Sequence, residues 1–551
     1  MGMPSTANNE EFIASLKRKE EEELVRYLAQ KRGLPYLDLT RAAIEVDALY
    51  LVPQEKAREA GIAVIKQVGK HLTVAALNPD IKETEEALED LKKQKFSLEI
   101  FLVSPQSLAA AWERYKEGGV STPIEQGVIT LGESPQATAS FTDDLAKLAH
   151  AANIRQVSRI FELLLLWALH EEASDLHIEP EEKSAKIRLR LDGILYDMAF
   201  IPSAVFKLLL SRIKLISELK LNIHERAQEG RFTVRTQKND IEVRTSVVPG
   251  VYGESIALRI LHPRTIALGL HDLGMHPLIS AAMEEEIKKP NGMILTTGPT
   301  GSGKTTTLYA FLKYVRSPKI KIITIEDPVE YHLEGITQTQ VDTAKNYHFA
   351  NGLVALLRQD PDVIMVGEIR DLETAQTALH AALTGHLVFS TLHTNNAPAT
   401  IPRLIDLGVK PNIIAPAINV AMAQRLVRRL CETCKIQKNA ALEESALIEE
   451  ILNAMPIPYR PKTPDQNFVI FEPNEKLSCS ACGGRGWKGR IGVFEVFRID
   501  DAIENLILQQ PSEAMIRAQA IKQGMLTLRQ DGILKVIQGI TSLEELKRVA
   551  G

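Results

Sequence analysis

The sequence predicts an α/β protein built around a parallel sheet and preceded by two smaller α+β regions. Three observations predict this class. From residue 278 onward, short β-rich runs alternate with helical segments, the pattern of parallel strands joined by crossover helices. Residues 185–261 hold a run of alternating strands, the first of them predicted over 185–198, which indicates a mainly antiparallel sheet. Residues 35–116 alternate short apolar runs with helical stretches, which suggests a small α+β domain.

Changes in composition predict where these regions end. The segment 117–141 is rich in Gly, Ser, Thr and Pro without a clear period, which is typical of a linker, and 262–277 holds the Pro and Gly residues of a hinge. The predicted organisation is an N-terminal accessory domain (1–116), a linker (117–147), a first lobe (148–262), a hinge (263–277) and a C-terminal α/β domain (278–551) that includes a cysteine-containing subdomain (428–498).

Composition and charge restrict the class of protein. The 551 residues are 45% hydrophobic and 25% charged, and 65 basic against 70 acidic residues give a net charge of -5. This balance argues against a protein held mainly by nucleic-acid phosphates, although it is compatible with a local basic channel. The longest apolar run, "FELLLLWAL" at 161–169, is far shorter than the ~18 residues of a membrane span and predicts a buried helix. The polar, acidic start does not resemble a secretory signal, so we expect a cytoplasmic chain that meets the membrane only through partners.

The stretch "GPTGSGKTTTL" at 298–308 predicts a nucleotide-binding loop. It satisfies the G-x-x-x-x-G-K-[ST] pattern and stands between a predicted strand and a predicted helix. The glycines allow backbone N–H groups to surround phosphates, Lys304 places a charge at the β and γ oxygens, and Thr305 can ligate Mg²⁺. The expected ATP-binding residues are Gly298, Pro299, Thr300, Gly301, Ser302, Gly303, Lys304, Thr305 and Thr306.

Acidic residues follow two of the predicted strands. "DVIMVGEIRD" at 362–371 is an apolar strand ending at Glu368, which would stand beside the phosphate loop and hold the water shell of Mg²⁺. "TIEDPVEY" at 324–331 offers Glu326, Asp327 and Glu330 at a strand end. The simpler interpretation of that cluster is a solvated acidic turn, but a triphosphate hydrolase needs a carboxylate to polarise the attacking water.

Two histidines flank another apolar strand. "TGHLVFSTLHTN" at 384–395 places His386 and His393 at its two ends. Single histidines are usually satisfied core or surface residues. In a nucleotide-hydrolysing protein, the pair could instead sense the γ-phosphate.

The four cysteines form two C-x-x-C pairs, Cys431 with Cys434 and Cys479 with Cys482. In a reducing cytosol this spacing favours metal over disulfides, and four thiolates suit one tetrahedral Zn²⁺ with no open position for catalysis. The predicted role is structural, and the alternative is four free buried thiols. Residues 435–478 separate the pairs by more than a compact zinc ribbon allows, so we expect this insert to loop out.

In this order and spacing, "GPTGSGKTTTL", "ITIEDPVEY", "LRQDPDVIMVGEIRDLETA" and "TGHLVFSTLHTN" resemble the four motifs of the secretion ATPases of type II secretion and type IV pilus systems. The resemblance runs from about residue 150 to the C-terminus. It implies a cytosolic hexameric ring ATPase, in which a PAS-like lobe at 148–262 precedes a RecA-like domain. It also implies that Glu330 is the general base, Glu368 the Walker B acid, and His386 with His393 the His-box pair.

The same resemblance implies that arginines complete the nucleotide site from a neighbouring subunit, because the ring packs one subunit's first lobe over the next subunit's nucleotide. The stretches "QEGRFTVR" and "IEVRTSVVPGVYGESIALRI" make Arg231 and Arg244 the candidates. Arginine at this place would stabilise charge on the transferring phosphoryl group. The alternative is that both arginines pair with surface acids on exposed strands.

The cysteines and the N-terminal region narrow the resemblance further. "CETC…CSACGGRGWKGRIGVFEVF" resembles the tetracysteine element of assembly ATPases of the GspE/PilB type, which retraction ATPases usually lack. The 35–116 region resembles the accessory domain of these proteins, where some relatives bind cyclic di-GMP through repeated motifs. This sequence holds no convincing pair of such motifs, so we expect no cyclic di-GMP there and consider docking to a membrane-anchored partner instead.

The leading hypothesis is a homohexameric motor that uses ATP, Mg²⁺ and a structural Zn²⁺. It would act on an inner-membrane platform protein to assemble a pilus or a secretion pseudopilus. A RecA-like nucleic-acid translocase is the alternative. It predicts a basic pore and aromatic stacking residues, whereas aromatic residues make up only 5% of the chain, so no nucleic-acid partner is expected. A small-molecule P-loop kinase would explain neither the cysteines nor the long N-terminal half.

Overall fold

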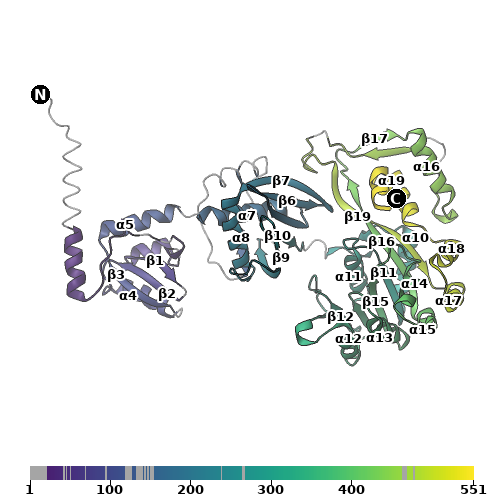
Figure 1. Cartoon of the computed structure of the whole chain (residues 1–551), viewed down its shortest axis with the longest axis horizontal. Coiled ribbons are helices and arrows are strands. Elements are labelled where there is room, and N and C mark those ends of the chain that lie inside the picture. Colours follow the sequence, from purple (N-terminus) through teal and green to yellow (C-terminus); the bar gives the residue numbers. More distant parts are fainter. Residues whose placement is uncertain are drawn as a thin grey trace. The chain divides into compact units, whose positions relative to one another are not determined.

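The computed structural model describes residues 21–117, 127–131, 141, 144, 145, 148, 154–262, 267–461 and 468–550, except positions 41, 43, 45, 50, 69, 94, 95, 238, 476 and 477. The chain forms two compact units, Met1–Thr130 and Leu131–Gly551 (Figure 1). Most of the predicted linker at 117–147 and positions 263–266 of the predicted hinge lie outside the described residues.

The first unit is built on a three-stranded sheet. Strand β1 pairs antiparallel with β2, and β2 pairs parallel with β3, so the region combines both orientations as an α+β domain does. Ser104 caps α5 by accepting a hydrogen bond from the Ser107 N–H. Residues 21–32 are helical, and the further elements are α2 (Val46–Leu49), α3 (Gln54–Glu59), β1 (Ile62–Val68), β2 (His71–Ala76), α4 (Lys82–Lys93), β3 (Ser97–Leu102), α5 (Pro105–Glu113), η1 (Arg114–Glu117) and β4 (Val128–Thr130).

The second unit begins with a mainly antiparallel sheet, in which β8, β9, β10, β5, β6 and β7 follow one another. Along β6, buried and half-buried side chains alternate, because every second residue faces the side of the sheet that helix α8 covers. The prediction of one strand over 185–198 was too long, since Asp192 and Gly193 adopt left-handed φ angles of 50° and 90° and turn the chain back. The elements are α7 (Ile154–His170), β5 (Asp175–Pro180), β6 (Ser184–Leu191), β7 (Ile194–Pro202), α8 (Ser203–Ile216), β8 (Gln228–Arg235), β9 (Asp240–Gly250) and β10 (Gly253–Ile260).

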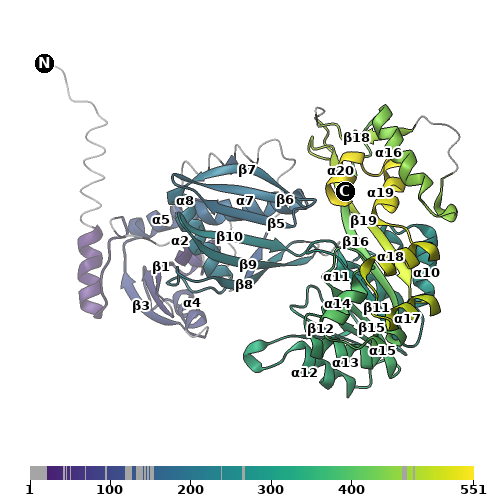
Figure 2. The ribbon, with the colours of Figure 1, turned by 45° about the vertical axis from the view of Figure 1, so that its right-hand side comes forward.

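The second sheet of this unit is the predicted parallel sheet. Its order is β13-β12-β14-β15-β11-β16-β19, and all neighbours are parallel except the final pair (Figure 2). The strands β11, β12, β14 and β15 are buried along their whole length because both faces are covered: Ile294 of β11 belongs to one core cluster, and Met293 and Leu295 belong to the other. Helix α11 contributes to the first cluster and α13 to the second, so these helices cover opposite faces.

This sheet and its helices place the C-terminal half of the chain. In order, the elements are η2 (Leu270–Leu273), α10 (Pro277–Ile287), β11 (Gly292–Thr297), α11 (Lys304–Val315), β12 (Ile322–Glu326), β13 (Thr337–Gln340), η3 (Thr343–Lys345), α12 (Phe349–Leu357), β14 (Val363–Val366), α13 (Leu372–Leu383), β15 (Leu387–Leu392), α14 (Thr400–Asp406), α15 (Pro411–Ala417), β16 (Ile418–Leu430), β17 (Ile436–Asn439), α16 (Leu442–Asn453), η4 (Ile457–Tyr459), β18 (Val469–Glu472), β19 (Trp487–Arg498), α17 (Asp501–Leu508), α18 (Glu513–Gln523), α19 (Leu528–Ile537) and α20 (Leu543–Ala550).

The insert between the cysteine pairs does not simply loop out. Its strands β17 and β18 pair with each other, and its helix α16 packs on α19. Ile448 and Ile451 of that helix belong to the same buried cluster as Ile294 of the parallel sheet. The insert is therefore a folded layer of the domain. Sequence spacing could not reveal this, because the partner helix α19 lies far along the chain.

The apolar run 161–169 lies within α7, and its Phe161 and Leu165 are buried, as predicted. Among the described residues, no helix combines the length and the apolar character needed to cross a membrane.

Candidate functional site

The loop between β11 and α11 depends on glycine at three positions. Gly298, Gly301 and Gly303 have φ angles of 149°, 78° and 88°, which side chains rarely permit. Space is also limited, since a Cβ at Gly298 would lie 2.6 Å from the Gln424 carbonyl oxygen and one at Gly303 would lie 2.8 Å from Gln424 Nε2. Gln424 itself accepts a hydrogen bond from Thr307 Oγ1 at 2.7 Å. The β16 strand therefore supports the loop from behind.

Lys304 is the first residue of α11, and its ammonium group turns back onto this loop. Nζ donates to the carbonyl oxygens of Gly298 at 2.8 Å and Pro299 at 3.2 Å. The pKa of Lys304 is lowered, mainly by burial and also by the Arg425 guanidinium, while the Glu368 carboxylate opposes this shift. Thr305 is exposed. Because carbonyl oxygens are weaker partners for an ammonium than phosphate oxygens, these contacts can be exchanged for a bound anion.

Glu368 stands at the carboxyl end of β14, at the same edge of the sheet as the phosphate loop. Parallel pairing produces this arrangement, because the carboxyl ends of β11, β14 and β15 share one edge. The Glu368 carboxylate lies 2.5 Å from Arg370 Nη2 and 3.2 Å from His393 Nε2. The structure thus brings His393 and Glu368 together beside the loop.

His386 lies at the opposite edge of the sheet. It precedes β15, and its carbonyl oxygen accepts a hydrogen bond from Gly292 N–H at the start of β11. Its ring Nδ1 lies 3.0 Å from the Ala381 carbonyl oxygen. Since β15 runs the full depth of the sheet between the two histidines, His386 does not join His393 within one chain.

Glu330 contacts the first sheet of the unit. Arg244 of β9 donates from Nη1 to Glu330 Oε2 at 2.7 Å and from Nη2 to the Val329 carbonyl oxygen at 2.5 Å. Its Nε also lies 3.8 Å from Glu242. Arg231 is directly opposite Arg244 in the β8–β9 register and is exposed, so the two arginines share one face of the sheet.

The three carboxylates of the 324–331 segment have different environments, and Asp327 is exposed. Glu326 is 2% exposed and accepts hydrogen bonds from Tyr309 Oη at 2.5 Å and Thr324 Oγ1 at 2.6 Å. Burial raises the pKa of Glu326, an effect that these donors oppose. Glu330 keeps 29% of its side chain exposed. An exposed or partly exposed carboxylate can meet an incoming water, whereas the buried Glu326 cannot. The cluster is therefore neither a uniform solvated turn nor a uniform catalytic group.

Arg425 is a residue at this edge that sequence reasoning missed. It lies on β16, its Nη1 would be 3.1 Å from a Cβ at Gly298, and its Nη2 donates to the Asn395 carbonyl oxygen at 2.6 Å. Burial lowers its pKa. The guanidinium thus links the phosphate loop to the loop that follows His393. The surrounding strand sequence is ordinary and gave no signal of this.

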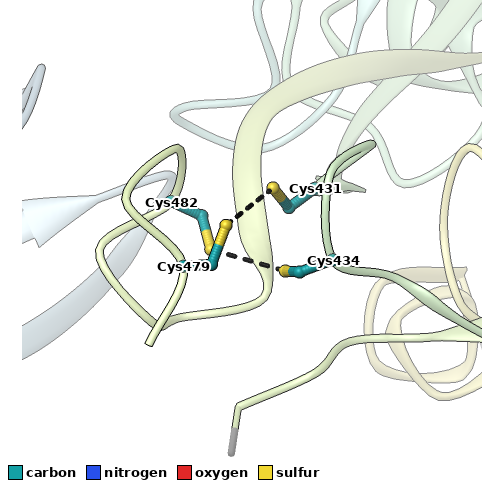
Figure 3. A group of neighbouring side chains, drawn as sticks. All are labelled: Cys431, Cys434, Cys479 and Cys482. Atoms are coloured by element: carbon teal, nitrogen blue, oxygen red, sulfur yellow. Dashed lines mark hydrogen bonds between the residues drawn. The ribbon is translucent and has the colours of Figure 1, made fainter. Parts of the chain in front are cut away.

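The four cysteines meet as predicted from their spacing. Figure 3 shows the two pairs facing each other, with Cys431 Sγ 3.9 Å from Cys479 Sγ and Cys434 Sγ 3.7 Å from Cys482 Sγ. All four sulfur atoms lie within 4.8 Å of one another, and all four side chains are buried. The pairs converge because Cys431 follows β16, while β19, which begins after Cys482, pairs antiparallel with β16.

These distances fit a tetrahedral metal centre. A tetrahedron with metal–sulfur bonds of about 2.3 Å has edges of about 3.8 Å, close to the sulfur–sulfur distances of 3.9 and 3.7 Å in the two facing pairs. No disulfide joins the four thiols. The donor set and its size suit Zn²⁺ or another soft cation, and every corner is taken by sulfur.

A glycine-rich loop at the carboxyl edge of a parallel sheet, with a lysine, a threonine and acidic side chains around it, defines a nucleoside-triphosphate-binding α/β protein. Comparison with known proteins identifies the kind. The family described as type II/IV secretion system protein matches residues 150–548, and a family described as the MshEN domain matches residues 32–122. The chain belongs to the type II/IV secretion system protein family.

Its relatives include both pilus and secretion proteins. The type IV pilus assembly ATPase PilB of Myxococcus xanthus is 36% identical over 530 residues, which cover 96% of this chain and 91% of that protein. The type II secretion system protein E of Aeromonas hydrophila is 43% identical over 393 residues, covering 71% and 75%. The ATPase DotB of Yersinia pseudotuberculosis has the same fold, with a TM-score of 0.51, 19% identity, and coverage of 77% of this chain and 98% of that one. Family and phosphate loop together make this chain an ATPase.

Proposed function

We propose that this ATPase is the subunit of a homohexameric ring at the cytoplasmic face of the inner membrane. The ring would drive assembly of a type IV pilus or a type II secretion pseudopilus through a membrane-embedded platform protein. The observation that carries this proposal is the contact between Arg244 of the antiparallel sheet and Glu330 of the parallel sheet. A motor must couple its nucleotide site to movement of a second body, and this contact joins the two. The names of the pilus and secretion relatives support filament assembly as the process that ATP hydrolysis drives.

In this proposal, the chain's own residues have distinct roles in hydrolysis. Residues 298–306 hold the phosphates through backbone N–H groups, and Lys304 neutralises the β and γ oxygens. Thr305 and the Glu368 region would hold Mg²⁺, which supplies charge stabilisation at the transferring phosphoryl group when bound. Glu330 accepts the proton of the attacking water, for which its partly exposed carboxylate is suited.

In this proposal, movement of the two lobes follows from the pairing of Glu330 with Arg244. When the triphosphate and the attacking water occupy the site, both compete with Arg244 for the Glu330 carboxylate. The equilibrium between lobe positions shifts toward whichever arrangement binds ATP better. Arg231 and Arg244 remain the candidates for contacts with a neighbouring subunit's nucleotide, and His386 is a candidate only for a role outside its own chain's site.

The cysteine cluster has a structural role in this proposal. Cys431, Cys434, Cys479 and Cys482 would hold one Zn²⁺ with no open position, so the metal stabilises the region where β16 and β19 leave the sheet. The PAS-like lobe (148–262), the RecA-like domain (278–551) and the accessory domain (1–116) are the proposed functional divisions. The absence of cyclic di-GMP binding in the accessory domain stays a prediction.

The test is made in the source cell with Lys304→Ala in place of the wild type. Surface filaments are counted by electron microscopy and exported proteins are assayed in the same culture. Loss of filaments with intact export identifies a pilus motor, and loss of export with intact filaments identifies a secretion motor. Lys319→Ala is the matched control, because Lys319 is exposed and lies beyond the end of α11. If neither property changes, the motor proposal fails.

The alternative, a nucleic-acid translocase, predicts that DNA or RNA stimulates the ATPase. Purified protein is assayed with and without single-stranded and double-stranded nucleic acid. Stimulation that disappears in high salt would favour the translocase. Turnover that is independent of nucleic acid favours the filament motor.

A further inference from the structure

The segment that carries Glu330, residues 327–333, belongs to no helix or strand. Its shape therefore depends on contacts from neighbouring side chains. Strand β13 runs parallel to β12, which directly precedes this segment, and places Gln338 opposite Thr324. Gln338 is half-buried against this segment.

Gln338 uses its whole amide group on three partners. Its Oε1 accepts from the Leu333 N–H at 2.7 Å, and its Nε2 donates to the Tyr331 carbonyl oxygen at 2.9 Å and to Glu326 Oε1 at 3.2 Å. The orientation of the amide follows from these partners, because a backbone N–H can only donate and a carbonyl oxygen can only accept. The residues of both backbone partners, Tyr331 and Leu333, follow Glu330 closely in the chain.

The third partner connects this arrangement to the phosphate loop. Glu326 is buried, and its second oxygen accepts from the Tyr309 hydroxyl at 2.5 Å. Tyr309 lies on α11, the helix that begins with Lys304. Hydrogen bonds thus run from the phosphate-loop helix through Tyr309, Glu326 and Gln338 to the segment of Glu330.

We propose that Gln338 is a positioning residue that holds the Glu330 carboxylate where it can take a proton from water, with Glu326 and Tyr309 anchoring it to α11. The proposal rests on the proposed role of Glu330 as the base. Gln338 acts through Glu330, so its loss slows the chemical step and leaves the phosphate loop and ATP binding intact. A side chain with only a packing role would change stability and every kinetic constant together.

Gln338→Glu tests this with almost no change in shape. Glutamate keeps an acceptor toward Leu333 but loses both donors and places a carboxylate against Glu326. Because small misplacements of a catalytic group can cost about 100-fold in rate, we expect kcat to fall by about that factor. The KM for ATP and the Kd for ADP should stay within about twofold, since uniform binding is not affected.

Gln340→Glu is the matched control on the same strand. Gln340 is exposed, and its amide oxygen accepts from the Val329 N–H at 3.4 Å, which a carboxylate oxygen can also do. The control should therefore have a kcat close to that of the wild type. Both variants add one negative charge to β13, so a difference between them reports the lost donors of Gln338.

The pH profile separates positioning from packing. Two carboxylates in contact raise the pKa of one of them, and its protonated form can donate again. The kcat deficit of Gln338→Glu should therefore shrink as pH falls from about 8 to about 5.5. Gln338→Met, which has no titrating group, should show a lower kcat with a constant deficit. If Gln338→Glu fails to fold, the kcat of Gln338→Met alone tests the positioning role.

Glu330→Gln in the same assays separates this proposal from the proposed function. If Glu330→Gln loses turnover while Gln338→Met keeps it, the positioning role is wrong and the base assignment stands. If Glu330→Gln keeps turnover, the base assignment is wrong and the positioning role falls with it. Parallel losses of melting temperature, KM and kcat in both Gln338 variants would also overturn the positioning role.

Discussion

The nucleotide edge of the parallel sheet and the cysteine cluster are built in opposite ways, although one strand serves both. Ala423 of β16 pairs with Thr297 just before the phosphate loop, and Leu430 at its end precedes Cys431. At the nucleotide edge, charged groups are partly exposed and pair with one another. At the cluster, the four thiols are between 1% and 6% exposed.

The difference reflects how long each ligand stays. A substrate that enters and leaves needs an open site, where groups such as Glu330 and Glu368 hold partners that can be replaced. A structural metal needs a closed site, in which every donor is already in place and no corner is free for water. Turnover should therefore respond to changes at the first region, and stability to changes at the second.

Glu330→Gln should give the largest loss of turnover. The amide cannot accept a proton from water, and general-base catalysis contributes about 10²- to 10⁴-fold. ATP affinity should be retained, because the phosphate loop is untouched. Steady-state hydrolysis and equilibrium binding of a labelled nucleotide measure the two effects. Glu334→Gln, an exposed carboxylate nearby, is the control. Full turnover in Glu330→Gln would remove Glu330 from the mechanism.

Arg244→Ala should lower kcat less than Glu330→Gln but more than Arg231→Ala. Of the two arginines, Arg244 is the one with a described contact to Glu330, and removing one preorganised donor costs about 10²- to 10³-fold in kcat when that donor stabilises transition-state charge. Hydrolysis rates of the two single variants and the double variant give the measurement. Equal losses from both arginines would show that contact with Glu330 is not the deciding property.

Cys479→Ser should release metal with little change in turnover per folded chain. The hydroxyl is a poor substitute for a thiolate, so bound metal measured by elemental analysis should fall from one per chain to near zero, and the melting temperature should fall with it. Ser480→Ala, at the exposed neighbouring position, should change neither. Unchanged metal content would refute the four-thiolate site. A large loss of ATP affinity would contradict the separation of the two regions.

Glu545→Gln should have the smallest effect, a pH-dependent loss of stability near the cluster. Burial alone raises the pKa of Glu545, but hydrogen bonds from Arg548 and Arg428 hold it below its ordinary value. A lowered pKa stabilises the fold above the unfolded-state pKa of about 4.3, and this contribution is lost as pH falls through the folded-state value. Melting temperatures of variant and wild type should therefore differ at neutral pH and converge in acid. A constant difference would contradict this account, and Glu544→Gln is the exposed control.

Local patterns predicted much of this molecule. The phosphate loop, the strand that precedes Glu368 and the convergence of the cysteines all depend on residues close in sequence or on a strict spacing. The Arg244–Glu330 contact depends on two sheets meeting, which no local pattern contains. Likewise, strand periodicity placed His386 and His393 on one strand. The direction and neighbours of that strand, which a single sequence does not give, decide that only His393 reaches the loop.

The remaining differences have the same origin. The Asp192–Gly193 turn was readable in principle, since Asp-Gly is a favoured hairpin pair, but the apolar run on both sides suggested one strand. The roles of Gln338 and Arg425 follow from partners that approach from other strands. The insert at 435–478 gains its structure from α19, which the chain reaches only later.

The pairing of β16 with β19 also has a consequence for biosynthesis. At about 5–20 residues per second, a ribosome needs roughly 3 to 14 s to travel from Leu430 at the end of β16 to Arg498 at the end of β19. During that interval, the edge of β16 that faces away from β11 lacks its partner strand and could pair with other nascent chains. Even after β19 is made, two hydrogen-bond partners of β16 are still missing: the Ile540 carbonyl oxygen, which accepts from the Leu430 N–H, and the Glu545 carboxylate, which accepts from Arg428. Chains truncated within α20 before Glu545 should therefore accumulate as insoluble protein, even though their nucleotide loop is intact.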